Sequence, residues 1–470
     1  MALDHPAKPL AETERTRLLA IAAELGPKMV ELAQGLWENP ELGYLEEKSS
    51  ALLAAACEEA GFEVKRGVGG LPTAFLATRK RGEGPVIGFL AEMDALPGFS
   101  QDASPRRSPI PDQNKGHACG HHLFGAASLG AGLALATWQD EAGLDGEIRI
   151  YGCPAEEGGA GKVFMARAGL FEGLDIALHW HPDDCNTVWQ SRSLASINAK
   201  VRFHGRTAHA AMSPEKGRSS LHALEAFHHM ASLMREVVPQ DTHIHYVTLS
   251  GGEAPNVIPD FAESHIGVRH PDPGAAAEVF ERIEKAAEGA ALGTGTRVEV
   301  ERLGAVHSLL PNSVVGAVML ANMEVLPRIT WSNEEYTWAA ELQESFEAPP
   351  ELSQIGRLNP YNYNALGPFS TDVGDVSWLV PTGMLGTATW VPGTRPHTWQ
   401  AVAAGGMSIG WKGMQAAAEG LAVSGASFLA DPALVARAWD EHRAQRGEGY
   451  RYKALVGDAE PPFDYQVGKG

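Results

Sequence analysis

The stretch VIGFLAEMD, residues 86–94, decides the fold of this chain. A run of apolar and small residues that ends in acids is typical of a strand buried on both faces of a sheet. Similar runs occupy residues 147–153 and 175–178, and helical patterns lie around them at residues 13–37 and 125–138. Strands that alternate with helices predict an α/β domain, in which helices cover both faces of a mixed, largely parallel sheet.

The pattern changes near residue 195, where apolar and polar residues begin to alternate. Alternation with a period of two predicts a strand with one buried face. The elements that follow are a helix at about 217–237, strands near 243–250 and 261–269, a helix near 274–289 and a strand near 296–303. This βαββαβ order predicts a ferredoxin-like domain inserted into the larger one. The predicted insertion is residues 194–308, and the larger domain comprises residues 1–193 and 309–470.

Composition excludes several classes of function. The chain has 470 residues with a formal net charge of −20, and 44% of its residues are hydrophobic. This length exceeds one compact core and predicts two domains. An acidic chain lacks the basic face that nucleic-acid binding needs, so no nucleic-acid partner is expected. An anionic substrate would need local Arg or Lys groups, because the net charge repels it at long range.

Three features of the sequence predict where the protein resides. The cysteines, at positions 57, 119, 153 and 185, are too few and too scattered for a disulfide framework, which favours a reducing compartment. The N-terminus has no basic segment followed by an apolar run, so no secretory signal is expected. No apolar run is long enough to span a bilayer. We therefore expect a cytoplasmic protein without a membrane partner.

The stretch KGHACGHH, residues 115–122, contains the strongest candidate ligands for a metal ion. Cys119 and His121 flank one glycine, and thiolate and imidazole are ligands that zinc and similar ions prefer. Both can reach one site only if the backbone turns sharply, which Gly116 and Gly120 permit. The alternative is a small buried cysteine with ordinary loop histidines, but their concentration between glycines argues against it.

Two adjacent acids, Glu156 and Glu157, follow the strand at residues 147–153. Adjacent side chains cannot point the same way, so one carboxylate can bind a metal while the other acts as a general base. The alternative is a pair of acids that complement a helix dipole. Together with Asp94 and the Cys/His loop, these acids lie just after strands, where α/β enzymes place their sites.

Other histidines are weaker candidates. His179 and His181 end a predicted strand, and their spacing does not choose between them as ligands. His397, between turn-forming residues, is by itself more typical of a surface position. His209, in the segment GRTAHA of the insertion, could act as an electrophile on a carbonyl oxygen, or it could lie in a solvated turn.

Taken together, these motifs resemble the aminoacylase and glutamate-carboxypeptidase family of two-metal peptidases (peptidase family M20), and within it the amidohydrolase branch. The resemblance covers nearly the whole chain. It rests on motifs in the same order, namely EMDALPG at 92–98, GHACGH at 116–121, the pair Glu156-Glu157, WHP at 180–182, GRTAH at 205–209, PNVIP at 255–259 and STDVGDVS at 370–377.

The resemblance implies a role for each candidate residue in the larger, catalytic domain. Cys119 would bridge two divalent ions per subunit, zinc or manganese, with cobalt or nickel as alternatives. The other implied ligands are His121, Glu157, His181 and His397. His181 is preferred over His179 because it directly precedes Pro182. Glu156 would be the general base. Asp94 would not bind an ion itself but would orient one of the ligands by contacting it on the side away from the ion.

The insertion resembles the dimerisation, or lid, domain of the same family. There His209 would reach into the active site of the partner subunit and stabilise the oxyanion. Asn256 and Arg269 would hold the substrate, Arg269 through a forked pair with a carboxylate. Two departures from the family pattern concern the pocket: His122 replaces an acid or amide, and Arg395-Pro396-His397-Thr398 replaces Pro-Gly-His-Ser.

The predicted function is therefore hydrolysis of the amide bond of N-acyl or N-aroyl amino acids by a homodimeric enzyme, with p-aminobenzoyl-glutamate-like compounds as the leading substrates. Another aminoacylase, dipeptidase or aryl-amide conjugate hydrolase on the same scaffold is an alternative. A related second subunit is a further possibility for the partner. The non-enzymatic alternative is a catalytically silent subunit that binds an amino acid conjugate or serves a structural role.

Overall fold

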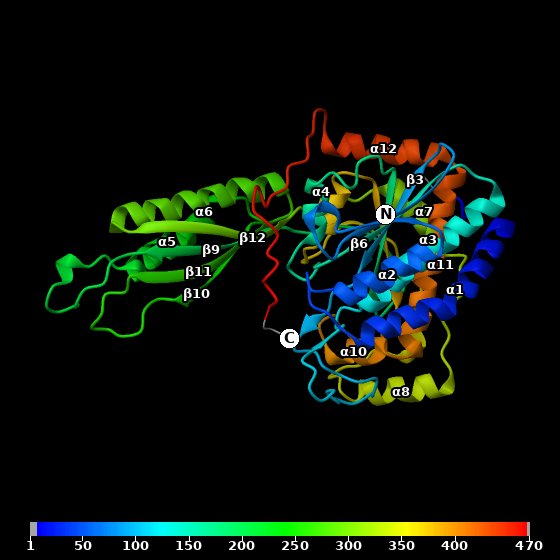
Figure 1. The fold of residues 1–470 in the computed structure, drawn as a ribbon, viewed down its shortest axis with the longest axis horizontal. Coiled ribbons are helices and arrows are strands. Elements are labelled where there is room, and N and C mark those ends of the chain that lie inside the picture. The colour runs from blue at the N-terminus through cyan, green and yellow to red at the C-terminus, as the bar shows by residue number, and fades with distance from the viewer. Residues whose placement is uncertain (1–6, 468–470) are drawn as a thin grey trace.

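The structure, a computed structural model, describes residues 7–467. Its larger domain is built on an eight-stranded sheet with the order β1-β2-β6-β3-β7-β14-β8-β13 (Figure 1). The strands of this sheet are β1 Glu63–Arg66, β2 Phe75–Arg81, β3 Val86–Glu92, β6 Gly146–Cys153, β7 Ile176–Asp183, β8 Thr187–Arg192, β13 Asn362–Leu366 and β14 Thr382–Ala388. The central strands β6, β3, β7 and β14 pair in parallel, whereas β2 and β8 run antiparallel to their inner neighbours.

The helices of this domain cover both faces of the sheet. They are α1 Glu12–Glu38, α2 Glu47–Glu59, α3 His121–Ala142, α4 Gly161–Arg167, α7 Ser313–Met323, α8 Asn333–Gln343, α9 Val373–Ser377, α10 Trp399–Gly405, α11 Ser408–Ala430 and α12 Pro432–Arg446. Phe89 of β3 packs into one core with α3 and its neighbours α1 and α11. Leu90 points the other way, into a core that includes α4 and α9. The predicted α/β class, with its mixed sheet, is confirmed.

The second domain is an antiparallel sheet with the order β10-β11-β9-β12, covered by two helices. Its elements are β9 Ala195–His204, α5 Ser220–Met234, β10 His243–Ser250, β11 Phe261–His270, α6 Pro273–Thr294 and β12 Arg297–Val306. Their order is the predicted βαββαβ. Residues of β9 alternate between buried and half-buried, because α5 and α6 cover only one face of the sheet. Figure 1 shows this lid extending away from the larger domain.

After α12 the chain runs from the larger domain to its junction with the lid and then back along the larger domain (Figure 1). We call residues 447–467 the C-terminal segment. Arg302 of β12 donates to the carbonyl of Leu455 at 3.0 Å, and Arg167 at the end of α4 donates to the carbonyl of Gly457 at 3.1 Å. Farther on, the hydroxyl of Tyr465 donates to the carbonyl of Glu157 at 3.1 Å. The segment therefore contacts the lid, the sheet domain and the loop of the two acids.

No single helix within residues 7–467 has the length and apolar composition to cross a membrane, and only α11 and α12, taken together across a 98° bend, meet those limits.

Candidate metal centre

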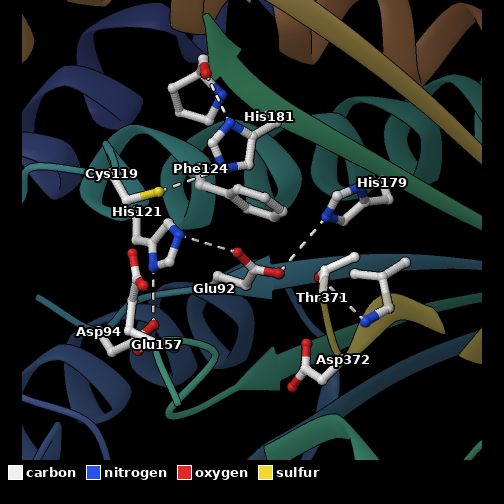
Figure 2. Close-up of polar contacts among 12 residues, drawn as sticks. Glu92, Asp94, Cys119, His121, Phe124, Glu157, His179, His181, Thr371 and Asp372 are labelled. Carbon is white, nitrogen blue, oxygen red and sulfur yellow. Dashed lines mark hydrogen bonds and ion pairs between the residues drawn. The ribbon is translucent and has the colours of Figure 1, made fainter. Parts of the chain in front are cut away.

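The expected ligands of the larger domain converge at the carboxyl ends of three neighbouring strands. Strand β3 leads into Asp94, β6 leads into Glu156 and Glu157, and β7 carries His181. Figure 2 shows Asp94, Glu157 and His181 around the Cys119 and His121 side chains. Strand β5 (Lys115–Gly116), which pairs with β4 (Leu96–Pro97), leads into the Cys/His loop before α3. Sites of open α/β sheets lie at this edge, as the sequence predicts.

The sharp turn between Cys119 and His121 depends on Gly120. This residue has a φ of 75°, a left-handed conformation that favours glycine. A Cβ atom at this position would lie 2.8 Å from Pro182, the residue after the candidate ligand His181. Gly120 therefore lets the loop carrying Cys119 approach the end of β7 closely.

Two sets of donor atoms share the thiol of Cys119. The first set is Cys119, His121 and His181, and the second is Cys119, Glu157 and His397; within each set the donor atoms lie within 4.8 Å of one another. The Cys119 Sγ is 3.4 Å from His181 Nε2, and His397 Nε2 is 2.9 Å from Glu157 Oε1. Thiolate, imidazole and carboxylate suit zinc and similar divalent ions, so these residues fit two ions with Cys119 between them.

Hydrogen bonds behind these residues determine which ring nitrogen faces the site. Asp94 Oδ1 lies 2.8 Å from His121 Nδ1, and Asp94 Oδ2 accepts the backbone N–H of Glu157 at 2.9 Å. The Nδ1 of His181 donates to the carbonyl of Pro182 at 2.7 Å. Both histidines therefore present Nε2 to the site, an arrangement that orients metal ligands in proteins.

The sequence did not distinguish His179 from His181, but the structure separates them. His181 lies beside Cys119, whereas His179 Nε2 lies 3.5 Å from Glu92 Oε1 and belongs to neither set of donors. His397 has a φ of 60°, and its N–H donates to the carbonyl of Ala118, which brings the C-terminal part of the domain to the Cys/His loop.

Burial and neighbouring charges perturb the acids of the site in opposite directions. Burial, with the charges of Glu92 and Glu157, raises the pKa of Glu156 well above its usual value. For Glu157 burial acts in the same direction, but the hydrogen bond from His397 and the nearby His121 outweigh it and lower its pKa. Burial acts on both acids, but only Glu157 has cationic partners that outweigh it, so the two neighbouring carboxyls differ as an acid–base residue and a ligand should.

The Cys119 thiol and one of the two imidazoles of the first set, that of His181, are also perturbed. Burial, and then the charge of Glu157, raises the pKa of Cys119 well above its usual value. Burial lowers the pKa of His181 to about 4. A neutral imidazole is ready to bind a cation, whereas the thiol needs a cation nearby to become a thiolate.

Sequence reasoning missed a buried ion-pair chain behind the site. Lys162 Nζ lies 2.6 Å from Glu92 Oε1 and 2.7 Å from Asp372 Oδ1, and all three side chains are at most 1% exposed. Glu92 Oε2 in turn lies 3.2 Å from His121 Nε2. The sequence contained part of this chain, because Glu92 and Asp372 belong to motifs that carry the family resemblance. Lys162, in the segment GGAGK after the two acids, could have been recognised only as a lysine close to these acids.

The two departures from the family pattern leave the expected ligands in place. His122 points away from them, because its Nε2 donates to the carbonyl of Gly405 at 3.0 Å and its ring lies 4.9 Å from that of His117. Thr398 caps α10, where its hydroxyl accepts the N–H of Ala401, a role that serine and threonine share.

The lid residues His209, Asn256 and Arg269 lie apart from these ligands. In the part of the chain that the structure describes, no hydrogen bond or ion pair joins them to the metal centre. The backbone of Ala210 pairs with that of Asn256, so the loops of His209 and Asn256 lie side by side. The Nδ1 of His209 accepts the N–H groups of Ala211 and Met212, which leaves the ring proton on the exposed Nε2.

Arg269 lies on β11 opposite His243 of β10 and lines a pocket of about 580 Å³. Asn198 and Pro368 line the same pocket, which places it at the end of the lid nearest the larger domain.

Comparison with known proteins agrees with this geometry. A family model described as a peptidase dimerisation domain matches residues 194–294. The chain is 37% identical to one of the subunits of p-aminobenzoyl-glutamate hydrolase of Escherichia coli (strain K12), over 88% of this chain and 92% of that protein. The chain belongs to the M20 peptidase family. It is therefore a hydrolase that acts on amide bonds.

Two further relatives of this M20 protein show how broad the family is. The Xaa-Arg dipeptidase of Mus musculus is 28% identical over 81% of this chain and 82% of that protein. The crystal structure of a dinuclear metal-binding peptidase from Bacillus subtilis has a TM-score of 0.57 and 21% identity, and the match covers 87% of this chain and 99% of that one. This likeness shows a shared fold.

Proposed function

We propose that this protein is a metal-dependent amidohydrolase that releases an amino acid from N-acyl or N-aroyl amino acids, with p-aminobenzoyl-glutamate-like compounds as the leading substrates. The observation that carries the proposal is the pair of donor sets that share Cys119, with Glu156 close to His121. The similarity to the Escherichia coli p-aminobenzoyl-glutamate hydrolase chain, over most of both proteins, supports the substrate class.

Cys119, His121 and His181 would hold one divalent ion, and Cys119, Glu157 and His397 would hold the other. Bound divalent ions supply Lewis-acid chemistry, which polarises an amide carbonyl and makes water a better nucleophile. Zinc or manganese fits this donor set, and cobalt or nickel are alternatives.

Glu156 is the proposed general base. Its carboxylate would take a proton from the attacking water and return it to the leaving amine. It lies within 4.8 Å of donor atoms of His121 and Glu92, and burial raises its pKa. A carboxyl whose pKa is raised accepts a proton and holds it until the amine leaves, which suits both steps.

The lid would complete the site across a homodimer. His209 presents an N–H at Nε2, the donor that a developing oxyanion needs. Asn256 and Arg269 would hold the carboxylate of the amino acid, since a guanidinium binds carboxylates in a forked pair. The similarity of residues 194–294 to a peptidase dimerisation domain supports a role of the lid in dimerisation. A related second subunit is the alternative partner. The proposed location is the cytoplasm.

The first experiment is hydrolysis of p-aminobenzoyl-glutamate by metal-stripped protein reconstituted separately with zinc and with manganese. Release of glutamate that depends on the added ion is the expected result. Metal binding without release of glutamate would contradict the substrate. Neither binding nor release would favour a catalytically silent subunit.

A dipeptidase that releases a cationic residue is the second candidate. The net charge of −20 favours cationic over anionic substrates at long range, and the mouse relative is an Xaa-Arg dipeptidase. A panel of N-acyl amino acids and dipeptides that differ only in the charge of the released residue separates the two functions.

A further inference from the structure

A cavity of about 590 Å³ lies where the lid, the larger domain and the C-terminal segment meet. The lid contributes Arg302 of β12 and the first turns of α6, and the larger domain contributes Trp378 and Arg446. The C-terminal segment lines the cavity where it passes the junction of the two domains (Figure 1). None of the candidate metal ligands lines this cavity, and its volume is in the range of sites that bind small molecules.

The cavity is basic, although the protein is acidic. The chain has 58 acidic and 38 basic residues, so a random cavity would be lined mostly by acids. The basic residues that line this one are Arg302, Arg446, Arg451 and Lys453, and the acidic ones are Asp272 and Glu281. Asp272 is engaged as the cap of α6, where its carboxylate accepts the N–H of Ala275 at 2.7 Å. A local excess of positive charge attracts anions.

The cations of the cavity differ in whether they have a partner. Arg302 is paired with Glu284 at 2.9 Å. Within residues 7–467, the side chains of Arg451 and Lys453 form neither a hydrogen bond nor an ion pair, and Arg446 has no carboxylate partner. Unpaired cations are common on protein surfaces, but these three lie around one cavity. Their charges are therefore available to a ligand.

Arg446 is a cation held in place before any ligand binds. Its guanidinium lies over the rings of Trp439 and Tyr450, at 5.9 Å and 5.3 Å from their centroids, and donates to the carbonyl of Trp378 at 2.9 Å. Burial lowers the pKa of Arg446, because no carboxylate compensates for the lost water. An anion in the cavity would supply the missing negative charge.

His307 adds a contact that suits an anion carrying a proton. Its Nδ1 donates to Asp375 Oδ1 at 2.8 Å, and the hydroxyl of Tyr452 donates to the same oxygen at 2.8 Å. The ring lines the cavity, and its Nε2 has no hydrogen-bond partner in the described part of the chain. A neutral ring would accept a P–OH group at Nε2, and a protonated ring would donate to a P–O⁻ group. Phosphate offers both groups, so the contact exists in either state of His307.

We propose that this cavity binds a phosphate group, with Arg446, Arg451 and Lys453 contacting its oxygens and His307 as a further contact. A phosphate monoester has about −1.5 to −2 charges at pH 7 and three acceptor oxygens, which suits three cations better than a single carboxylate does. Free phosphate and a small phosphate monoester share this chemistry. A monoester would place its organic part beside the rings of Trp378 and Tyr450, which also line the cavity. The bound group would connect the C-terminal segment to the larger domain at the lid junction.

The experiment is calorimetric titration of the full-length, zinc-loaded protein with inorganic phosphate, with adenosine 5′-monophosphate and with adenosine. The double variant Arg451→Gln/Lys453→Gln should bind the phosphate group about 10–100-fold more weakly than the wild type. The matched control is Arg437→Gln/Lys285→Gln, which removes the same charge at two exposed positions outside the cavity and should bind like the wild type. Similar affinity for phosphate and the monophosphate would assign the site to free phosphate, and tighter binding of the monophosphate would assign it to a monoester.

Three outcomes of the titration would overturn the inference. They are unchanged binding in the double variant, an equal loss in the control, and adenosine binding as tight as that of the monophosphate. The titration is repeated with metal-stripped protein, because metal ions also bind phosphate. Binding that disappears with the metal would place the phosphate at the metal centre and not in this cavity.

A second measurement needs no variant. Trypsin cleaves after Arg451 and Lys453, which are exposed in the C-terminal segment. The bound phosphate group should slow cleavage at these two bonds and leave cleavage after Arg357, in an exposed loop elsewhere, unchanged. Unchanged cleavage after Arg451 and Lys453 at a saturating concentration of phosphate and of the monophosphate would contradict the site. Neither measurement involves amide hydrolysis, so the result does not depend on the proposed function.

Discussion

Glu156 is the residue whose substitution separates binding from chemistry. Glu156→Gln keeps the shape of the side chain but removes the base, so we expect kcat to fall by about 10²–10⁴-fold. Metal content should stay at the wild-type level, because neither set around Cys119 includes Glu156. The measurement pairs turnover with metal analysis, and Glu172→Gln, an exposed acid of the same domain, is the control. Retained turnover would refute the role of Glu156.

His442 of α12 links stability to pH away from the metal centre. Its side chain is 1% exposed, and its Nε2 donates to the carbonyl of Ser377 at 2.7 Å. Burial, with the charges of Arg446 and Arg443, lowers its pKa from 6.5 to about 4. Between these values the unfolded chain binds the proton more tightly than the folded one. The stability contribution is therefore complete above pH 6.5 and is lost as pH falls toward 4.

We expect the loss from His442 to reach about 3 kcal/mol in the free energy of unfolding at pH 4. His442→Gln can still donate to Ser377 but does not titrate, so its stability should fall less steeply between pH 6.5 and 4. Urea unfolding of both proteins across this range measures the difference. Parallel curves would show that His442 does not contribute to the acid sensitivity.

The residues that sequence reasoning found share a local pattern. Cys119 and His121 lie one glycine apart, and Glu156 and Glu157 are adjacent, so their chemistry is visible in a short window. The chain of Glu92, Lys162 and Asp372 has no such pattern, because the lysine and Asp372 are 210 positions apart. Ion pairs between distant segments depend on the strand order, which single residues do not reveal.

At the scale of elements, periodicity predicted the helices α1, α3, α5 and α6 and the buried strands β3, β6 and β7, but no element was predicted after residue 309, where the buried strand β14 and the long helix α11 lie. The helix expected at 13–37 is Glu12–Glu38, and the run that opens at residue 86 forms β3. The edge strands β1 and β13 were not predicted, because their exposed, polar sequences show neither apolar runs nor strict alternation. Their positions depend on pairing with β2 and β8, which is a property of the sheet and not of the segment.

The C-terminal segment makes a testable contribution to the loop of the two acids. Tyr465 donates to the carbonyl of Glu157, and Tyr44, which packs against the Tyr465 ring at 5.9 Å, donates to the carbonyl of Gly159. Tyr465→Phe removes one hydroxyl, so we expect a loss of about 1 kcal/mol in stability and easier proteolysis near residues 155–161. Thermal melting and limited proteolysis measure both effects. Tyr336→Phe, in α8, is the matched control, and equal proteolysis of the two variants would contradict the prediction.

At the scale of the whole molecule, one of the two edges of the lid sheet, strand β10, is the expected dimer contact. Strand β10 lies at the edge, and its Val247 and Leu249 are 56% and 51% exposed. A charged side chain there should prevent pairing of two edges. We expect Leu249→Lys to shift the protein to a monomer on gel filtration with light scattering, with its metal retained and its turnover lost. Leu292→Lys, on α6 and 85% exposed, should remain wild-type. An active monomer would refute the completion of the site by a partner.

The position of the lid explains why the sequence could not place every site residue. Among residues 7–467 no hydrogen bond or ion pair joins His209 or Arg269 to the metal centre, so neither spacing nor one copy of the fold brings them to the ligands. The family resemblance supplied the idea of a partner. The orientation of His209, with Nδ1 accepting two N–H groups, is the feature that the structure adds.

Mixing two inactive variants tests whether His209 acts across the dimer. His209→Ala and Glu156→Gln should each be inactive as homodimers, since each lacks one part of every site. In a mixed dimer the His209→Ala chain keeps Glu156 and receives His209 from its partner, so one site is complete. Equal amounts that exchange subunits freely should recover about a quarter of wild-type activity, because half of the dimers are mixed and each has one working site.

If His209 served its own chain, every site would remain defective, and mixing would restore nothing. Sedimentation with one labelled variant shows whether exchange occurred, so a lack of activity in exchanged dimers would contradict the partner role directly.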